Sequence, residues 1–233
     1  MTLRIENTGY LPINTKYNNK PQQRKASTTT KVASAIGSTV GVGLGMCAIT
    51  KKNPAKIVDA IKNPNKIINR LKKLELSGFD VIKIATSSIL GGFVAGSATD
   101  SHNAKAKAKE GIIQLIGNYI VPSLFVTGGI KLNKVLNKNF HYPPKTGIVQ
   151  FAFGMCSLVA GVFAGNKISR KLNSEIFQED TYRPLNWKDW GMQLDNVCLV
   201  TSMANEGTSL AKNVSKVIPV AHLVPGYLTG IKQ

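Results

Sequence analysis

Residues 32–50 read VASAIGSTVGVGLGMCAIT, a stretch without a charged side chain that places Gly37, Gly41 and Gly45 at intervals of four. Glycines four apart lie on one face of an α-helix and allow a second backbone to approach closely. In lipid, where helices gain little from burying apolar surface against each other, such close approach is a main source of association. The stretch therefore predicts a helix that packs through its glycine face.

The same spacing returns in two later apolar stretches. Gly92 and Gly96 carry it in the second stretch, and Gly161 and Gly165 carry it in the fourth. Together with the first three, these glycines are the residues we expect to make the helix-packing contacts.

Four segments of the chain have the length and composition of membrane helices. They cover residues 32–50, 81–99 (uncharged from 84), 111–130 and 146–166. A helix of about 20 residues spans the roughly 30 Å hydrocarbon core of a bilayer. The predicted fold class is therefore all-α, a small polytopic helical membrane protein with three to five membrane segments and G-x-x-x-G helix packing.

The predicted organisation has three parts. Residues 1–31 are polar and basic and are expected to form a disordered tail. Residues 32–170 form the helical membrane domain. Residues 171–233 form a C-terminal connector with a weak membrane-associated or re-entrant segment, because Lys216, Pro219 and Pro225 interrupt its apolar run.

A ten-residue repeat occupies part of the connector at 51–76. Residues 52–61 read KNPAKIVDAI and residues 62–71 read KNPNKIINRL. Each copy begins with Asn as a helix N-cap and Pro at the first helical position. The predicted product is a pair of short amphipathic helices with a basic face. The residues expected to contact anionic lipid headgroups are Lys52, Lys56, Lys62, Lys66, Arg70, Lys72 and Lys73. The equally open alternative is a helical connector that packs on the protein.

The chain is strongly basic, with 30 Lys and Arg against 12 Asp and Glu and a net charge of +18. Such an excess indicates an anionic partner, either a lipid surface or a nucleic acid. The bases lie between the apolar segments, and aromatic residues do not alternate with them, so no specific nucleic-acid partner is expected. The expected partners are the lipid bilayer and its anionic headgroups, with a homo-oligomer as a further expectation. The expected location is a bacterial inner membrane, with an organellar membrane as the alternative.

Counting basic residues in the connectors tests the membrane topology. If all four segments cross, the bases divide 14 to 12 between the two sides; if residues 32–50 do not cross, they divide 18 to 8. Membrane proteins usually show a strong bias toward the cytoplasmic side. The count therefore favours the hypothesis that residues 32–50 form a re-entrant or interior helix.

Little in the sequence predicts chemistry. Asp100 and His102, just after the second segment, could form a polar site at a membrane surface, but no nucleophile or second acid stands at a recognisable spacing from them. His222 is a lone histidine in an apolar stretch, where a hydrogen-bonded side chain is more usual than a ligand. We expect no enzyme activity, no cofactor and no metal site.

These observations predict an integral membrane protein of structural, scaffold or pore/translocation type. One alternative is a peripheral or soluble α-helical protein that binds anionic lipid, or less readily nucleic acid. Another is a membrane-embedded enzyme that uses Asp100 and His102.

Overall fold

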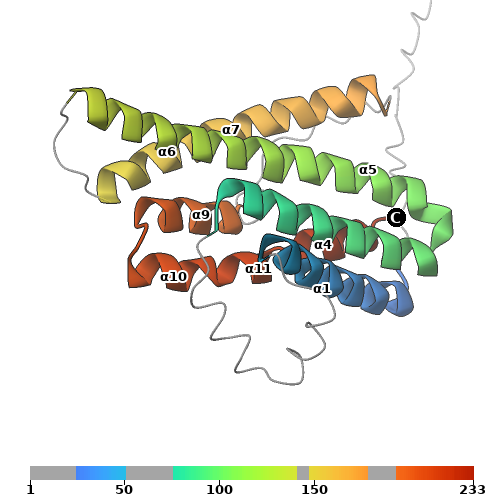
Figure 1. Ribbon diagram of the computed structural model, residues 1–233. Coiled ribbons are helices and arrows are strands. Elements are labelled where there is room, and N and C mark those ends of the chain that lie inside the picture. The colour runs from blue at the N-terminus through green and yellow to red at the C-terminus, as the bar shows by residue number, and fades with distance from the viewer. Residues whose placement is uncertain (1–24, 51–75, 141–146, 178–192) are drawn as a thin grey trace, which may run out of the picture.

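The structure, a computed structural model, describes residues 25–50, 76–140, 147–177 and 193–233, and within these ranges every regular element is helical (Figure 1). The predicted all-α class is therefore confirmed. The elements are α1 (Thr28–Thr50), α4 (Gly78–Thr99), η1 (Ser101–Asn103), α5 (Ala104–Gln114), η2 (Leu115–Ile120), α6 (Val121–Phe140), α7 (Gly147–Glu175), α9 (Leu194–Ala204), α10 (Ser209–Ser215), α11 (Val217–Ala221) and α12 (Leu223–Gly230).

Four helices are long and apolar enough to cross a membrane. They are Thr28–Ile49, Gly78–Thr99, Ser101–Lys138 and Gly147–Glu175. They cover the four predicted segments except for the end residues 50 and 146. The third is much longer than expected, because η1, α5, η2 and α6 as far as Lys138 follow one another as one 38-residue helical rod. At 1.5 Å per residue this rod is about 57 Å long, nearly twice the thickness of a hydrocarbon core.

Local sequence explains where α4 begins. The Ser77 hydroxyl accepts a hydrogen bond from the Asp80 backbone N–H at 3.3 Å, and the Asp80 carboxylate accepts one from the Ser77 N–H at 3.1 Å. This reciprocal capping satisfies two N–H groups that the first helical turn leaves without partners. Asp80 also pairs with Lys83 at 3.5 Å, which gives the basic residue near the start of the second predicted segment a partner at the helix end.

The long helices pack side by side in antiparallel pairs (Figure 1). α1 lies along α4, and α7 lies along η2 and α6. Among the short helices, α9 contacts α7 and α6, whereas α12 contacts α1 and α4. Gly207, with φ of 85°, makes the turn between α9 and α10, where a left-handed conformation requires a residue without a side chain. The described residues 193–233, which belong to the part predicted as a connector with a weak or re-entrant segment, thus contain four helices that pack on the bundle.

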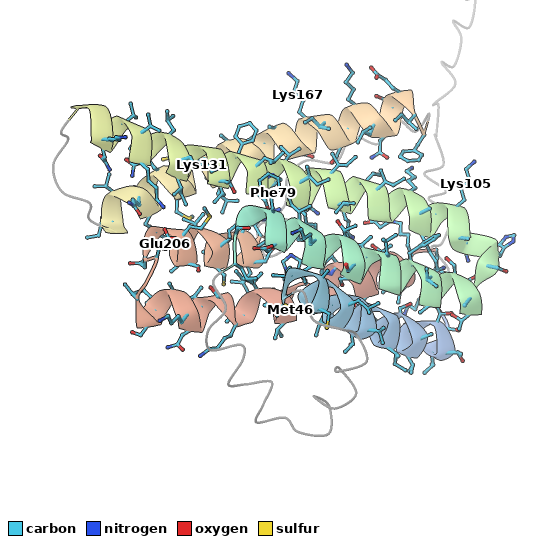
Figure 2. The ribbon with its side chains drawn as sticks, in the orientation of Figure 1. Met46, Phe79, Lys105, Lys131, Lys167 and Glu206 are labelled. Atoms are coloured by element: carbon cyan, nitrogen blue, oxygen red, sulfur yellow. The ribbon has the colours of Figure 1, made fainter. Side chains whose placement is uncertain are left out.

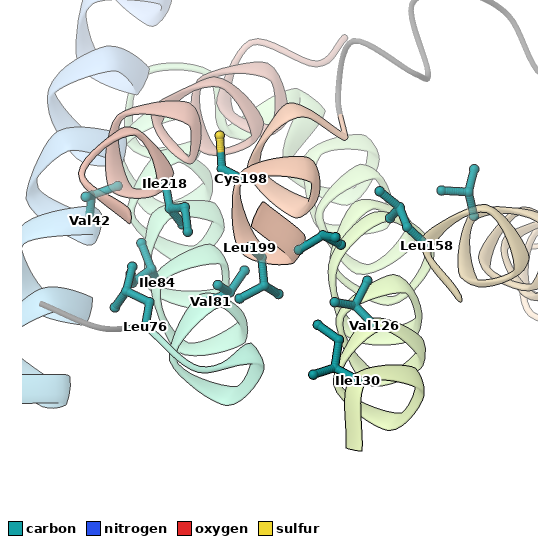
Figure 3. Close-up of a cluster of buried hydrophobic side chains, with 12 residues drawn as sticks. Val42, Leu76, Val81, Ile84, Val126, Ile130, Leu158, Cys198, Leu199 and Ile218 are labelled. Carbon is teal, nitrogen blue, oxygen red and sulfur yellow. The ribbon is translucent and has the colours of Figure 1, made fainter. Parts of the chain in front are cut away.

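An apolar core joins the helices at their centre. Leu199 of α9 is fully buried beside Val81 of α4, and Val126 and Ile130 of α6 belong to the same cluster (Figure 3). Ile218 of α11 completes the contact with α4. The core therefore ties the C-terminal helices to both antiparallel pairs.

Outside this apolar core, the distribution of side chains differs from that in most water-soluble proteins. Many large apolar side chains are exposed, among them Val32, Ile36, Val40 and Leu44, which form one stripe along α1 with 46–60% of their surface open. Many polar side chains are buried, including Ser34, Ser38, Ser88, Ser123, Gln193, Asp195, Asn196 and His222. Lysines such as Lys105 and Lys167 project away from the bundle (Figure 2).

Candidate functional site

The glycines of α1 face α4 at backbone distance. A methyl group added at Gly37 would overlap the carbonyl oxygen of Gly91, and one added at Gly41 would overlap that of Ser87. One added at Gly45 would lie 3.0 Å from the Cα of Ile84. All three glycines predicted in the first segment therefore lie where the two helix backbones approach most closely.

Gly92 and Gly96 of α4 face a different helix, α12. A methyl group at Gly92 would overlap the carbonyl oxygen of Gly226, and one at Gly96 would overlap that of Gly230. Gly226 and Gly230 are themselves four residues apart, in a fourth stretch with this spacing that the prediction did not include.

The third predicted pair, Gly161 and Gly165 of α7, lies against the long rod. A methyl group at Gly161 would lie 2.9 Å from the Cα of Pro122, and one at Gly165 would overlap the carbonyl oxygen of Gly117. Gly129, which has no partner at a spacing of four, is just as confined, because a methyl group there would overlap the hydroxyl of Ser157. Spacing alone therefore does not identify every glycine at a close approach.

The structure does not bring Asp100 and His102 together as a reactive pair. The Asp100 carboxylate instead accepts hydrogen bonds from Lys107 Nζ at 2.7 Å, from Asn103 Nδ2 at 3.0 Å and from Gln233 Nε2 at 2.8 Å. These contacts lower the pKa of Asp100 to about 2, and the hydrogen bond from Lys107 is the largest cause. His102 is exposed. Asp100 thus anchors the turn after α4 to the fully buried Lys107 ammonium.

The seven basic residues assigned to anionic lipid, Lys52, Lys56, Lys62, Lys66, Arg70, Lys72 and Lys73, lie outside the described residues. Their assignment stays a prediction.

A buried polar site that the sequence analysis did not predict lies between α9, α12 and η2. Asp195, in the first turn of α9, is 2% exposed, and His222, between α11 and α12, is fully buried. His222 Nε2 lies 3.3 Å from Asp195 Oδ2. Tyr119 of η2 covers the pair, with its ring centroid 5.1 Å from that of His222.

Pro122 explains how η2 contributes to this site. Proline has no N–H, so it cannot donate to the carbonyl four residues earlier, and its ring crowds that carbonyl. Before this proline the helix contains a π-turn, Leu115–Ile120, in which the Val121 N–H donates to the carbonyl of Ile116. The carbonyl of Asn118, released from its helical role, accepts a hydrogen bond from Asn196 Nδ2 at 3.1 Å. π-turns within α-helices often mark functional positions.

Asn196 connects this carbonyl to the rest of the site. Its amide group also donates to Gln193 Oε1 at 2.7 Å, and its Oδ1 accepts from the Ser123 hydroxyl at 3.2 Å. This network of buried hydrogen bonds fixes the first turn of α9, and with it the position of the adjacent Asp195.

The backbone fixes the tautomer of His222. Its Nδ1 lies 2.7 Å from the carbonyl oxygen of Ile218. Because a carbonyl only accepts, Nδ1 must carry the proton, and in a neutral imidazole Nε2 is then an acceptor. The backbone on the other side of this residue is also fixed, since the Ser88 hydroxyl donates to the His222 carbonyl at 2.5 Å.

Burial shifts the two titrating groups in opposite directions. It raises the pKa of Asp195 from 3.8 to about 7 and lowers the pKa of His222 from 6.5 to about 4. In each case the apolar surroundings disfavour the charged form. Both carboxyl oxygens of Asp195 and the Nε2 of His222 are without a hydrogen-bond partner of good geometry.

This site has an acid and a base but no second catalytic group or metal cluster among the described residues. In these ranges no three His, Cys, Asp or Glu side chains are grouped so that they could hold a metal ion. The arrangement can bind a proton between the carboxyl and the imidazole. Comparison of the chain with protein-family models, with curated proteins and with solved structures found no match.

Proposed function

We propose that this chain is an integral membrane protein of scaffold or translocation type, without enzyme activity, whose long helices lie in lipid and pack through small residues. The observation that carries the proposal is the outward-facing apolar surface. Besides the stripe on α1, Leu90 and Val94 on α4 and Phe163 on α7 are each more than half exposed. Monomeric proteins in water rarely expose apolar patches larger than a few hundred Å².

The buried polar side chains support the same proposal. In lipid, no water is present to satisfy hydroxyl and amide groups, so they must find partners between helices. Ser38 of α1 lies 3.0 Å from the Ser88 hydroxyl of α4 and donates to the Leu223 carbonyl of the C-terminal helices at 2.7 Å. One hydroxyl thus connects three helices at their glycine contacts.

The glycines would supply the close contact that this arrangement needs. Apolar side chains gain little by leaving lipid for another helix, so association depends on dispersion contacts and hydrogen bonds between nearby backbones. The seven predicted glycines lie at such approaches. We propose that they, with Gly226 and Gly230, hold α1, α4 and α12 together, and α7 against the rod.

The helix arrangement also bears on topology. α1 runs antiparallel to α4 over nearly its whole length. Thr30 lies beside Thr99 at one end of the contact, and Gly45 lies beside Ile84 toward the other. If α4 crosses lipid, α1 beside it crosses as well. This arrangement favours four crossings over the re-entrant α1 that the count of basic residues suggested.

The rod is longer than the hydrocarbon core, and α4 and α7 lie against overlapping parts of it. α4 extends from Thr127, beside Gly78, to Gly111, beside Ile89, and α7 extends from Gly129, beside Ser157, to Gly117, beside Gly165. We propose that the bundle is tilted in the membrane, as helices longer than the hydrocarbon core are. The basic α5 would then emerge at one headgroup layer.

Alkaline carbonate extraction of membranes from cells that express the full chain tests the proposal. The protein is expected to stay in the membrane fraction. Release into the supernatant would refute the proposal and support the peripheral alternative. Crosslinking of the retained protein then counts protomers and tests the expected homo-oligomer.

Cysteine labelling tests the topology. With the native cysteines replaced, single cysteines at Lys31 and Lys66 should react with a membrane-impermeant reagent from opposite sides. Labelling of both from the same side would support the re-entrant helix instead.

A further inference from the structure

We propose that Asp195 and His222 form an internal proton-binding site, in which the Asp195 carboxyl carries one proton and donates it to Nε2 of His222. The inference goes beyond the proposed function, because the pair is buried within the bundle whether or not the bundle lies in lipid.

The hydrogen-bond geometry of His222 leads to this assignment. The Ile218 carbonyl, 2.7 Å from Nδ1, requires a proton on Nδ1. The Nε2 lone pair of a neutral ring then faces Asp195 Oδ2 at 3.3 Å. Two acceptors facing each other would repel, so one proton must lie between them. A shift of a few tenths of an ångström brings the two atoms to ordinary hydrogen-bond length.

That proton can lie on either of the two side chains. Either the carboxyl is protonated and the imidazole neutral, or the carboxylate is ionised and the imidazole is a cation. Both side chains are almost completely buried, and separated charges are costly in such surroundings. The neutral arrangement is therefore favoured, and the opposite shifts of the two pKa values, upward for Asp195 and downward for His222, agree with it.

The neighbouring groups do not supply a compensating charge. The titratable groups of the described residues that interact with Asp195 are Tyr119 of η2 and Cys198 of α9. Both are neutral when protonated, and burial together with Asp195 raises the pKa of Cys198. From α4, the side that faces His222 presents the uncharged Ser88. A carboxylate here would lack a cation other than His222 itself.

The position of the pair gives the proton a structural role. Asp195 belongs to α9, which packs on α7 and α6, and His222 joins α11 to α12, which packs on α1 and α4. The shared proton is thus a contact between the two halves of the bundle. Its loss would set a carboxylate against the Nε2 lone pair and would weaken that contact.

Infrared spectroscopy of the purified full-length protein tests the assignment. At pH 6, the wild type should show the carbonyl band of a protonated carboxylic acid. The band should be lost in Asp195→Asn and retained in Asp100→Asn, the matched change at the carboxylate that binds Lys107. A wild-type spectrum with carboxylate bands only would overturn the proposal, and this result does not depend on how either variant folds.

Nitrogen NMR of histidine-labelled protein gives an independent reading. The His222 signal is identified by elimination, in a protein that carries His102→Gln and His141→Gln. At pH 6 it should be that of a neutral ring with the proton on Nδ1. An imidazolium signal, or a proton on Nε2, would refute the proposed site. Neither outcome depends on carbonate extraction, so failure of the membrane proposal and failure of the proton site are distinguishable.

Discussion

Substituting alanine for Gly41 measures what the close approach of α1 and α4 contributes to stability. The added methyl group overlaps the carbonyl oxygen of Ser87. That oxygen belongs to the α4 backbone and cannot rotate away, so the two helices must move apart. Gly43, two residues along the same helix, is the matched control, because a methyl group there meets nothing within 4 Å.

The expected magnitude follows from two opposing terms. Replacing glycine by alanine within a helix stabilises it by up to about 1 kcal/mol, and this gain is common to both positions. Overpacking a close contact costs about 1–3 kcal/mol, and only Gly41→Ala incurs that cost. The difference between the two variants therefore isolates the packing term, and Gly41→Ala should be less stable than Gly43→Ala by about 1–3 kcal/mol, or about 5- to 150-fold in the unfolding equilibrium.

Denaturant titration of the purified protein in detergent, followed by far-UV circular dichroism, provides the measurement. A disulfide formed between cysteines on α1 and α4 would report the separation of the helices directly. If Gly41→Ala and Gly43→Ala have equal midpoints, the glycine face does not support packing and the reasoning is refuted.

Three further changes test the buried and surface polar groups. His222→Leu leaves Asp195 buried without the imidazole that accepts its proton. Because burial raises the pKa of Asp195 in the folded state, the contribution of Asp195 to the free energy of unfolding is present below pH 3.8 and is lost as the pH rises through about 7. At 1.36 kcal/mol per pKa unit, the loss is roughly 4 kcal/mol. In Asp195→Asn, stability should depend on pH in the opposite direction, because the lowered pKa of His222 makes stability fall as the pH drops from 6.5 through about 4. If the unfolding temperatures of both variants change in the same direction from pH 4 to 8, both predictions are contradicted. Asp100→Asn should lower the unfolding temperature because it leaves Lys107 buried without its anion, whereas His102→Ala, at an exposed position, should change the free energy of unfolding by less than about 0.5 kcal/mol. In wild type, the Asp100 contribution is present above pH 3.8 and is lost as the pH falls through about 2.

The fold class could be predicted from the sequence because long uncharged segments leave few alternatives. A run such as residues 146–166 forms a helix in any apolar surrounding. The length of the rod could not be predicted in the same way. α5 contains the basic residues Lys105, Lys107 and Lys109, which placed the predicted start of the third segment after them, at residue 111, yet the helix already includes them. Lys107 is accommodated because Asp100 and the Lys232 carbonyl bind its ammonium.

The candidate site was not predictable from local pattern. Asp195 and His222 are distant in sequence, and each alone resembles an ordinary polar residue near an apolar stretch. Pro122 is the one local signal in the sequence that pointed to the site, because a proline inside a helix leaves a carbonyl that another group must satisfy. The sequence could not show that the repairing group is Asn196, because that contact depends on how α9 packs against η2.

Several residues that break local rules meet at one place in this bundle. Pro122 interrupts a helix, the π-turn that follows from it exposes the Asn118 carbonyl, and a carboxyl and an imidazole are buried beside it. Each of these features costs free energy, of the order of 1–3 kcal/mol or more. Natural proteins retain such costs mainly where function requires them. The helix defect and the buried acid–base pair therefore belong together, because the carbonyl that Pro122 releases binds Asn196, and Asn196 orients the turn of α9 that carries Asp195 toward His222.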